Sequence, residues 1–388
     1  MADSGDKSAQ CQNDMAGTIK KRQANFELLR LISMLMVVAL HYLSKGYVLP
    51  AFKAEMPGIN QYPAYLLESF CIVAVNVFIM LSGYFLVNAQ FRSRRVLQLT
   101  GQVLFYALLI PVVLFMAGGI NPGDMNLYTL GNDIFPIQTE HYWFATYYIF
   151  LYLCTPLLNR GIKAMNQRQH QIMLGFLLLA FSMPKSILPI PLATDRKGYD
   201  LVWFLCVYVI GAYIRRYGLD TIKWLNNRKK CAMVYIGGAL AVFALGIGMG
   251  LFTLSTGKLQ DQMNEVLQYN HILCVAASVG FFGVFYYTVI RDGIFSRFVC
   301  RISPYAFGVY LLHEQMDVRY LWPEWFHVRE ISATIWFLPH FIVTIIGIFI
   351  GGIMIDWFRT VIFHKVGKQL RHTKGAQYLE HIDEILKI

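Results

Sequence analysis

The sequence predicts an all-α membrane protein: a bundle of about ten transmembrane helices with both termini in the cytoplasm. Composition is the first reason, because 56% of the 388 residues are hydrophobic and only 15% are charged, whereas soluble domains carry about 25% charged residues. The apolar residues also fall into repeated runs that approach or exceed the roughly 18–20 residues needed to cross a bilayer. A soluble helical protein does not need such runs, so the expected surroundings are a lipid bilayer.

The predicted spans follow the apolar runs, and prolines bound or interrupt two of them. Pro184 and Pro189 do so in the fifth span, and Pro304 does so in the ninth. The spans are expected at residues 26–47, 64–88, 97–117, 142–158, 171–189, 199–214, 231–254, 272–290, 303–320 and 333–358.

The placement of Lys and Arg predicts the orientation. A net charge of +11 would suggest a nucleic-acid partner for a soluble protein. Here 26 of the 34 Lys and Arg residues fall in segments that are cytoplasmic if the N-terminus is inside, and eight fall in outer segments. The long outer segment 118–141 has none. This alternation is the positive-inside pattern of membrane proteins, and we expect no nucleic-acid partner.

Outside the spans the sequence predicts only tails. The first two dozen residues lack the apolar core and cleavage site of a signal peptide. We expect a disordered cytoplasmic tail at 1–24, a transmembrane domain at 25–360, and a cytoplasmic tail at 361–388 that can form an amphipathic helix. The seven cysteines show no CxxC or Cys/His ligand spacing, which predicts neither a disulfide nor a metal site.

The first span carries the most informative pair of side chains, Arg30 and His41. A separation of eleven residues at about 100° each places both on one helix face, roughly 16 Å apart along the axis. Ionisable groups in a membrane usually face the bundle interior. A histidine there can act as a general base near pH 7, and an arginine can hold a phosphate or carboxylate. The plainer alternatives are a hydrogen-bonded core histidine and an arginine that reaches the inner headgroups.

The second span and the loop after it hold polar residues near the cytoplasm. Asn76 lies deep in the span, while Ser82 and Gly83 either form a small-residue packing contact or take part in binding. A cluster of three arginines follows: Arg92, Arg94 and Arg95. The cluster is either an ordinary positive-inside loop or a docking site for a polyanionic cytosolic ligand, such as nucleotide phosphates.

Two predicted outer sites each combine a histidine with a glutamate. The first comes at the end of the long loop and contains Glu140, His141, Trp143 and Tyr147. The second comes late in the ninth span and contains Tyr310, His313 and Glu314. Aromatic residues at this depth form an interfacial belt in many membrane proteins, but they also stack on sugar faces. Two such sites on one side favour the binding of an acceptor.

These stretches resemble the acyltransferase-3 family of bacterial integral membrane acyltransferases, of the polysaccharide or glycan O-acetyltransferase type. The resemblance covers about residues 25–358. Arg30 and His41 match the family's first-span pair, with ten residues between them. Residues 78–86, 141–159 and 302–313 are similar to its second-span, fourth-span and late-span motifs. Asn76 departs from the family, in which many members carry Asp at that position.

The resemblance implies transfer of an acyl group, most often acetyl, from coenzyme A to a hydroxyl of an envelope or exported glycan. It implies a bacterial cytoplasmic membrane protein without a metal. His41 would be the general base or an acyl relay, and Arg30 would position the donor or hold the charge that develops at the thioester. The expected acetyl-CoA-binding residues are Arg92, Arg94, Arg95, Ser82 and Asn76. The expected acceptor-binding residues are Glu140, His141, Trp143, Tyr147, Tyr310, His313 and Glu314.

Two other classes of function remain open. An exporter or flippase of a glycan or lipid-linked sugar would also have outer aromatic residues on a helical bundle. A membrane sensor, or an assembly subunit with inactive motifs, is the third class. Hydrolysis of acetyl-CoA, or transfer from it, by the purified protein distinguishes an acyltransferase from a transporter.

Overall fold

The protein is helical wherever its elements are described. The computed structural model describes residues 22–49, 60–120, 126–188, 196–258, 265–370 and 374–386, and within these ranges every element is a helix. The all-α prediction is therefore confirmed for this part of the chain. Most of the predicted tail at 1–24 lies outside the described residues.

The elements are α1 (Ala24–Lys45), α2 (Gln61–Cys71), α3 (Ala74–Leu86), α4 (Ser93–Met116), α5 (Leu127–Ile134), α6 (Trp143–Ala164), α7 (Gln167–Phe181), α8 (Met183–Ile187), α9 (Leu201–Tyr217), α10 (Arg228–Thr256), α12 (Ile272–Tyr286), α13 (Ile294–Ile302), the 3₁₀ helix η3 (Ser303–Tyr305), α14 (Ala306–His313), α15 (Leu321–Trp325), α16 (Val328–Ser332), α17 (Phe337–Leu370) and α18 (Lys374–Ile385).

Long apolar helices identify a membrane protein. Among the described residues, five helical stretches are long and apolar enough to cross a bilayer: Ala24–Lys45, Gln61–Leu86, Ser93–Met116, Arg228–Thr256 and Phe337–Lys365. They coincide with the first, second, third, seventh and tenth predicted spans. A shorter apolar helix, α12, falls in the eighth. The count of about ten spans and the cytoplasmic placement of both termini stay predictions.

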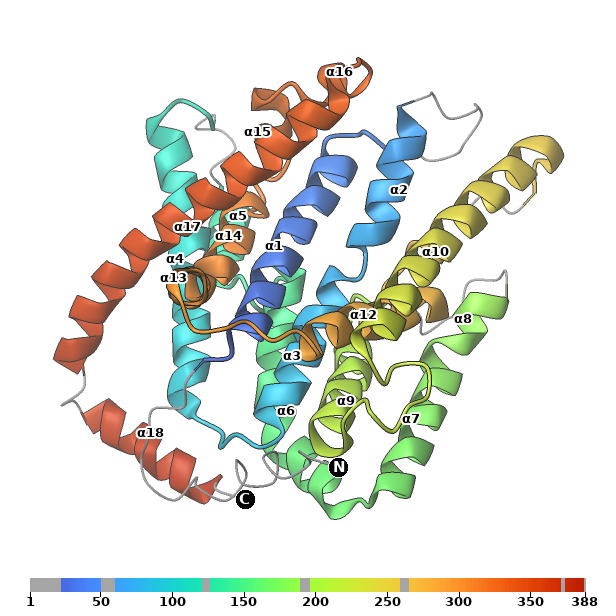
Figure 1. The fold of residues 1–388 in the computed structure, drawn as a ribbon. Helices are drawn as coiled ribbons and strands as arrows, with labels where there is room; N and C mark the ends of the chain where they lie inside the picture. The colour runs from blue at the N-terminus through green and yellow to red at the C-terminus, as the bar shows by residue number, and fades with distance from the viewer. Residues whose placement is uncertain are drawn as a thin grey trace.

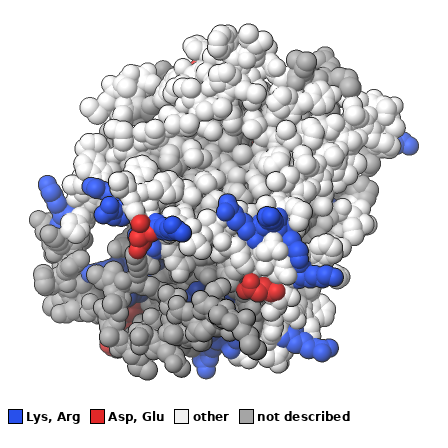
Figure 2. All heavy atoms as spheres, viewed as in Figure 1, with Lys and Arg blue, Asp and Glu red and all other residues white. Residues whose placement is uncertain are grey.

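The bundle has two chemically different ends. Figure 1 shows the starts of α1 and α4, together with α18, at its lower end, and the end of α1 with α15 and α16 at its upper end. In the same view, Lys and Arg form a band across the lower half, while the upper half of this face is almost free of charge (Figure 2). We call these the basic end and the far end. The basic end is the one that the sequence predicts to face the cytoplasm.

The first predicted span, α1, is the central helix. It packs against α2, α3, α12, α13, α14 and α17, and Leu29, Val38, Tyr42 and Leu43 on it are fully buried. A helix that is apolar on all sides is stable only where neighbours or lipid surround it. Neighbouring helices therefore cover most of the length of α1.

A close helix contact, between α3 and α9, depends on two glycines. A Cβ atom on Gly83 would lie 2.1 Å from the Tyr208 carbonyl oxygen, and one on Gly211 would lie 2.2 Å from the Met80 carbonyl oxygen. Small residues allow membrane helices to approach at backbone distance. Asn159 of α6 supports the pair, since it accepts a hydrogen bond from the Tyr208 hydroxyl at 2.7 Å. Of the two alternatives for Gly83, the structure favours packing.

A buried carboxylate joins α17 to α4 and α14. Asp356 is 0% exposed and accepts hydrogen bonds from Arg359 Nε at 2.6 Å, Gln102 Nε2 at 3.0 Å and the Tyr106 hydroxyl at 3.0 Å. The backbone of Gly308 lies against it, because a Cβ there would be 2.2 Å from the Asp356 carboxyl carbon. A charge at this depth is tolerated when it is paired. The network fixes α14 against its neighbours.

The predicted ninth span, 303–320, differs from the structure. In the structure, the helical part of this stretch consists of η3 (Ser303–Tyr305) and the eight-residue helix α14, which ends at His313. The backbone N–H groups of the following turn donate to Gln315 Oε1 at 2.7 and 3.2 Å, so the chain bends where a helix would continue. Eight residues rise only about 12 Å. The end of α14 therefore lies inside the bundle, and His313 and Glu314 are buried.

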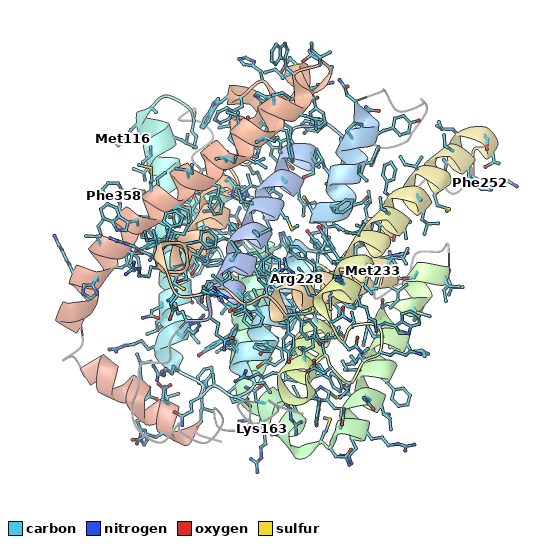
Figure 3. The ribbon with its side chains drawn as sticks, viewed as in Figure 1. Met116, Lys163, Arg228, Met233, Phe252 and Phe358 are labelled. Atoms are coloured by element: carbon cyan, nitrogen blue, oxygen red, sulfur yellow. The ribbon has the colours of Figure 1, made fainter. Side chains whose placement is uncertain are left out.

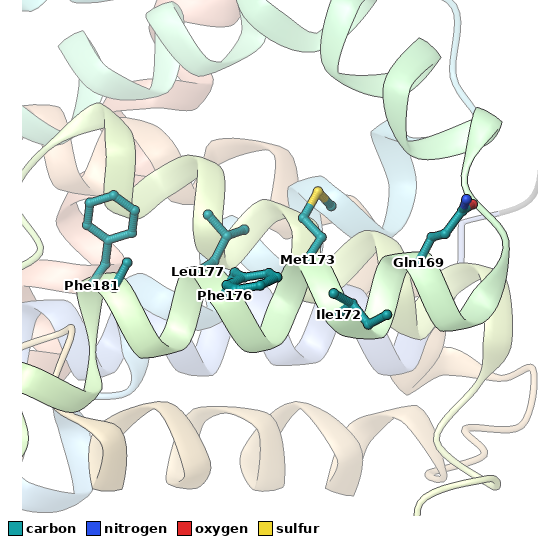
Figure 4. A pocket seen from close by; sticks show the side chains of 7 residues that line it. Gln169, Ile172, Met173, Phe176, Leu177 and Phe181 are labelled. Atoms are coloured by element: carbon teal, nitrogen blue, oxygen red, sulfur yellow. The ribbon is translucent and has the colours of Figure 1, made fainter.

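The outside of the bundle is apolar. Met116, Phe252 and Phe358 lie on its periphery (Figure 3) and are exposed. A shallow groove also runs along α7, lined by side chains from Gln169 to Phe181 without an ionisable group (Figure 4). Exposed apolar faces of this kind suit contact with lipid tails. Gln169 is the one polar side chain among the residues that line this groove, so the groove has no acid or base for catalysis.

Candidate active site

The centre of the candidate site is a contact between α1 and the end of α14. His41 Nδ1 lies 2.8 Å from His313 Nε2 and 3.3 Å from Glu314 Oε2. His313 and Glu314 are 1% and 3% exposed. The sequence placed these two residues with the acceptor, whereas the structure brings them against the predicted catalytic histidine.

The hydrogen bonds around the two histidines fix where the protons lie. His313 Nδ1 is 2.5 Å from the Val309 carbonyl oxygen, which only accepts, so Nδ1 carries the proton and Nε2 of neutral His313 accepts. His41 Nδ1 therefore faces two acceptors, His313 Nε2 and the Glu314 carboxylate. It must donate, which leaves the lone pair of neutral His41 on Nε2.

A small cavity lies beside His41. Its volume is about 20 Å³, which is room for one water molecule. Helices far apart in the sequence contribute its walls. The lining residues are Met34, Val37, Leu40, His41, Val75, Phe78, Trp143, Phe144, Tyr269 and Tyr310. Trp143 and Tyr310, predicted to bind the acceptor, are thus placed next to the imidazole.

Arg30 lies on the same helix but outside this cavity. Its guanidinium forms an ion pair with Glu27 one turn earlier, and its side chain is 30% exposed. Glu27 also accepts a hydrogen bond from the Ser303 hydroxyl at 2.5 Å. Arg30 is not among the lining residues. The structure therefore places it toward the basic end, away from the cavity beside His41.

Three of the predicted donor residues lie at the start of α4, and a fourth, Ser82 of α3, is linked to them. Arg92 precedes α4, and Arg94 and Arg95 lie in its first turn. Ser82 donates a hydrogen bond to the Tyr148 hydroxyl at 3.3 Å, and the same hydroxyl bonds Arg95. Ser82 is thus linked to the arginine cluster through one tyrosine.

Asn76 is the fifth predicted donor residue. Its Nδ2 donates to the Tyr269 carbonyl oxygen at 2.8 Å and to Ser278 Oγ at 3.2 Å, and its Oδ1 accepts from Trp203 Nε1 at 3.0 Å. These bonds tie α3 to α9 and α12. The amide is already satisfied by the protein, and its predicted role in donor binding stays a prediction.

The C-terminal helix covers the start of α4. Asp383 Oδ1 accepts a hydrogen bond from the Ser93 backbone N–H at 2.5 Å, and Ser93 Oγ donates to the Leu379 carbonyl oxygen at 3.2 Å. A helix N-terminus attracts anions because its first N–H groups are free. Asp383 therefore places a carboxylate where the arginine cluster and the helix end both favour negative charge.

The first predicted outer site divides into two pairs. Glu140 accepts a hydrogen bond from the Tyr147 hydroxyl at 2.5 Å and pairs with Arg196 at 3.2 Å. The Tyr147 hydrogen bond and then Arg196 hold the pKa of Glu140 below its usual value. His141 turns the other way, with Nδ1 3.6 Å from Asp133 Oδ1. Neither Glu140 nor His141 lines the cavity beside His41.

Comparison with known protein families gives a match over nearly the whole chain. The family model described as an acyltransferase domain, of the acyltransferase-3 type, matches residues 23–356. The chain belongs to the acyltransferase-3 family. The match covers nearly the whole sequence and includes Arg30, His41 and the motifs on which the predicted resemblance depends. Comparisons with curated proteins and with solved structures give no match.

Family membership defines the general chemistry of this acyltransferase. An acyltransferase-3 protein uses an acyl donor and an acceptor, and the apolar helices place this one in a lipid bilayer. Within the described ranges, no group of three or more His, Cys, Asp or Glu side chains is arranged to hold a metal ion. Which donor and which acceptor it uses are matters for the proposal below.

Sequence reasoning missed several residues around the acyltransferase site. They are Lys45 and Arg319 next to Glu314, Arg196 next to Glu140, and Tyr269 in the cavity wall. Lys45 carried a usable signal, because it follows His41 by four residues and so lies on the same helix face. The other three come from turns or distant helices, and no local pattern relates them to His41.

Proposed function

We propose that this acyltransferase moves an acetyl group from cytosolic acetyl-CoA to a hydroxyl of an envelope or exported glycan, in the plasma membrane of a bacterium. The observation that carries the proposal is the His41 imidazole. Its Nδ1 faces His313 and Glu314, and its ring borders a buried, aromatic-lined cavity. A histidine that is held in one tautomer by a hydrogen bond at Nδ1, with a carboxylate close to the same nitrogen, is suited to act as a general base.

In the proposed reaction His41 Nε2 takes the proton of the acceptor hydroxyl as the oxygen attacks the thioester carbonyl. The tetrahedral intermediate collapses, the carbon–sulfur bond breaks, and His41 returns the proton to the leaving thiolate of coenzyme A. Glu314 stabilises the imidazolium that forms between these steps, since its Oε2 lies 3.3 Å from Nδ1. Atoms and charge balance without a further reactant.

The size of the cavity supports a short acyl group. A volume of about 20 Å³ is below that of an acetyl group, so even acetyl must displace a lining side chain. Met34 is suited to this, because an unbranched thioether side chain adapts easily. A longer acyl chain would have to move Phe78 or Phe144 as well, which favours acetyl.

The donor is proposed to enter from the basic end. Arg92, Arg94 and Arg95 surround the N-terminus of α4, and the phosphates of coenzyme A are the polyanion that such a surface binds. Arg30 lies on α1 between this end and His41, and it is proposed to hold the donor after exchange of its Glu27 partner.

The direct test uses the purified full-length protein with acetyl-CoA. We expect slow release of the coenzyme A thiol by hydrolysis and faster release when an acceptor glycan is added. An exporter or flippase would release none. Comparison of envelope glycans from deletion and complemented cells by NMR then identifies the acceptor through its lost O-acetyl signals.

Replacing Glu314 with Gln is expected to lower kcat and leave the KM for acetyl-CoA unchanged. Gln keeps a polar oxygen beside His41 Nδ1 but removes the charge that stabilises the imidazolium, so we expect a loss of about 10- to 100-fold. Glu314→Asp should retain more activity, because it keeps the charge. Equal kcat values for Glu314→Gln and the wild type would show that the Glu314 charge does not stabilise the imidazolium.

Replacing Asp383 with Asn is expected to lower the KM for acetyl-CoA. The carboxylate of Asp383 occupies the N-terminus of α4, so its charge competes with the donor phosphates. Charge effects at helix ends are about 0.3–1 kcal/mol, which corresponds to about a two- to fivefold change in KM. Glu384→Gln, an exposed change on the same helix, is the control. A higher KM for Asp383→Asn alone would show that Asp383 organises the donor site.

A further inference from the structure

Two cations at the far end, Lys45 and Arg319, form long ion pairs with Glu314 beside the candidate base. Lys45 Nζ is 3.9 Å and Arg319 Nη1 is 3.8 Å from Glu314 Oε1, distances beyond a hydrogen bond. Arg319 Nε is buried and has no hydrogen-bond partner among the described residues. Among the described residues, Lys45 donates a long bond, 3.5 Å, to the Tyr320 hydroxyl. Within this part of the chain, most donors of the two cations therefore lack a close acceptor.

Two exposed tyrosines stand beside these cations. Tyr47 is 65% exposed and Tyr320 is 40% exposed, and their rings stack at 6.5 Å with an interplanar angle of 22°. Lys45 and Arg319 lie 5.0 and 5.3 Å from the centre of the Tyr320 ring. Tyr47 also has a φ of 53°, an uncommon backbone conformation outside glycine. An exposed aromatic face beside unused cationic donors suits a ligand with both an apolar face and an anionic group.

The local charge favours an anion. Glu314 is one acid against two cations, and it also lies 3.3 Å from His41 Nδ1. The next acid, Asp317, accepts a hydrogen bond from Gln315 Nε2 at 2.8 Å, and it acts electrostatically on Asp133 and His141. Arg319 acts on His141 as well. Among the described residues, Glu314 is the acid that pairs with both Lys45 and Arg319.

From these contacts we infer that Lys45, Arg319, Tyr47 and Tyr320 form an outer-mouth site for a pyranose sugar that carries an anionic substituent, a carboxylate or a phosphate. The sugar ring stacks on the tyrosines, and the anion takes the unused donors of Lys45 and Arg319. Because Glu314 lies close to both cations and to His41, a sugar bound at the cations has a hydroxyl directed toward His41. The inference rests on the proposed function in identifying this sugar as the acceptor.

The test measures sugar binding to the detergent-purified full chain by calorimetry, in the absence of an acyl donor. Three probes separate the chemistries: tetragalacturonate for the carboxylate, glucose 1-phosphate for the phosphate, and maltotetraose as the neutral sugar. We expect at least one anionic probe to bind about tenfold or more tightly than maltotetraose, and its binding to weaken as salt is raised. Equal binding of the neutral sugar, or no binding of any probe, would overturn the inference.

Variants assign the binding to the outer-mouth site. Lys45→Gln and Arg319→Gln should each weaken the anionic probe about tenfold, while Arg329→Gln, at an exposed cation on α16, should leave it unchanged. Arg319→Lys keeps the charge and should bind better than Arg319→Gln, which controls for folding. Binding that survives both Lys45→Gln and Arg319→Gln would place the sugar elsewhere. Since acetyl-CoA hydrolysis is measured separately, a protein that binds the sugar without hydrolysing acetyl-CoA would contradict the transferase proposal alone.

Discussion

His41→Ala is expected to abolish acyl transfer while the protein still folds into its bundle. The change removes the nitrogen that takes the acceptor proton, and positioned bases of this kind contribute about 10²- to 10⁴-fold to rate. It leaves His313 hydrogen-bonded to the Val309 carbonyl oxygen, so the end of α14 keeps its main contact. The measurement is release of the coenzyme A thiol by purified protein that elutes from size exclusion as the wild type does.

His340→Gln is the matched control. His340 is also a partly buried histidine next to α1, and its Nδ1 lies 2.8 Å from the Tyr42 hydroxyl, but it does not line the cavity beside His41. We expect this variant to retain activity. Full activity in His41→Ala would remove the base from the proposal. A radiolabelled acetyl group found on His41 after incubation without acceptor would make His41 an acyl relay instead of a base.

Local patterns in the sequence were enough to predict the fold class and the shared helix face of Arg30 and His41 on α1. Apolar runs predict membrane helices because the bilayer requires about 20 apolar residues in a row. The spacing of Arg30 and His41 predicts a shared helix face because a helix turns about 100° per residue. Both inferences depend on residues within one element, where geometry is fixed by the backbone.

The rest of the candidate site depends on contacts between distant elements. His41 and His313 are 272 positions apart, and Asp383 reaches Ser93 across 290 positions. No periodicity relates such residues, because helix packing and not the local backbone brings them together. The ninth predicted span shows the same limit. Its apolar composition suggested a crossing helix, but a hydrogen-bonded turn at Gln315 ends the helix inside the protein.

Because α14 ends inside the protein, it can present buried polar side chains to His41. Asp356 fixes the start of α14 through the close approach of Gly308, and the end of the helix then presents His313 and Glu314 to His41. A helix that crossed the membrane would have carried these side chains to the surface. Placing them at depth lets a carboxylate act on an imidazole away from water, where electrostatic interactions are stronger.

Among changes that add a single methyl group within residues 78–86, Gly83→Ala is expected to lower the stability of the protein most. A Cβ on Gly83 would lie 2.1 Å from the Tyr208 carbonyl oxygen, and backbone on both sides leaves no flexible side chain to move. Overpacking of this kind costs roughly 1–3 kcal/mol or more, and α3 would have to separate from α9. We expect a lower melting temperature for the purified variant, and lower activity as a consequence of the displaced Ser82.

The control for Gly83→Ala is Gly237→Ala in α10, where a new Cβ meets nothing within 4 Å. Alanine is the better helix former by about 1 kcal/mol, so this variant should be neutral or slightly more stable. The comparison separates the two explanations of the motif by what is lost first. If Gly83→Ala has the melting temperature of the wild type but does not turn over acetyl-CoA, the glycine serves binding. If the melting temperature falls, the glycine serves the contact between α3 and α9, which links Ser82 to the arginine cluster.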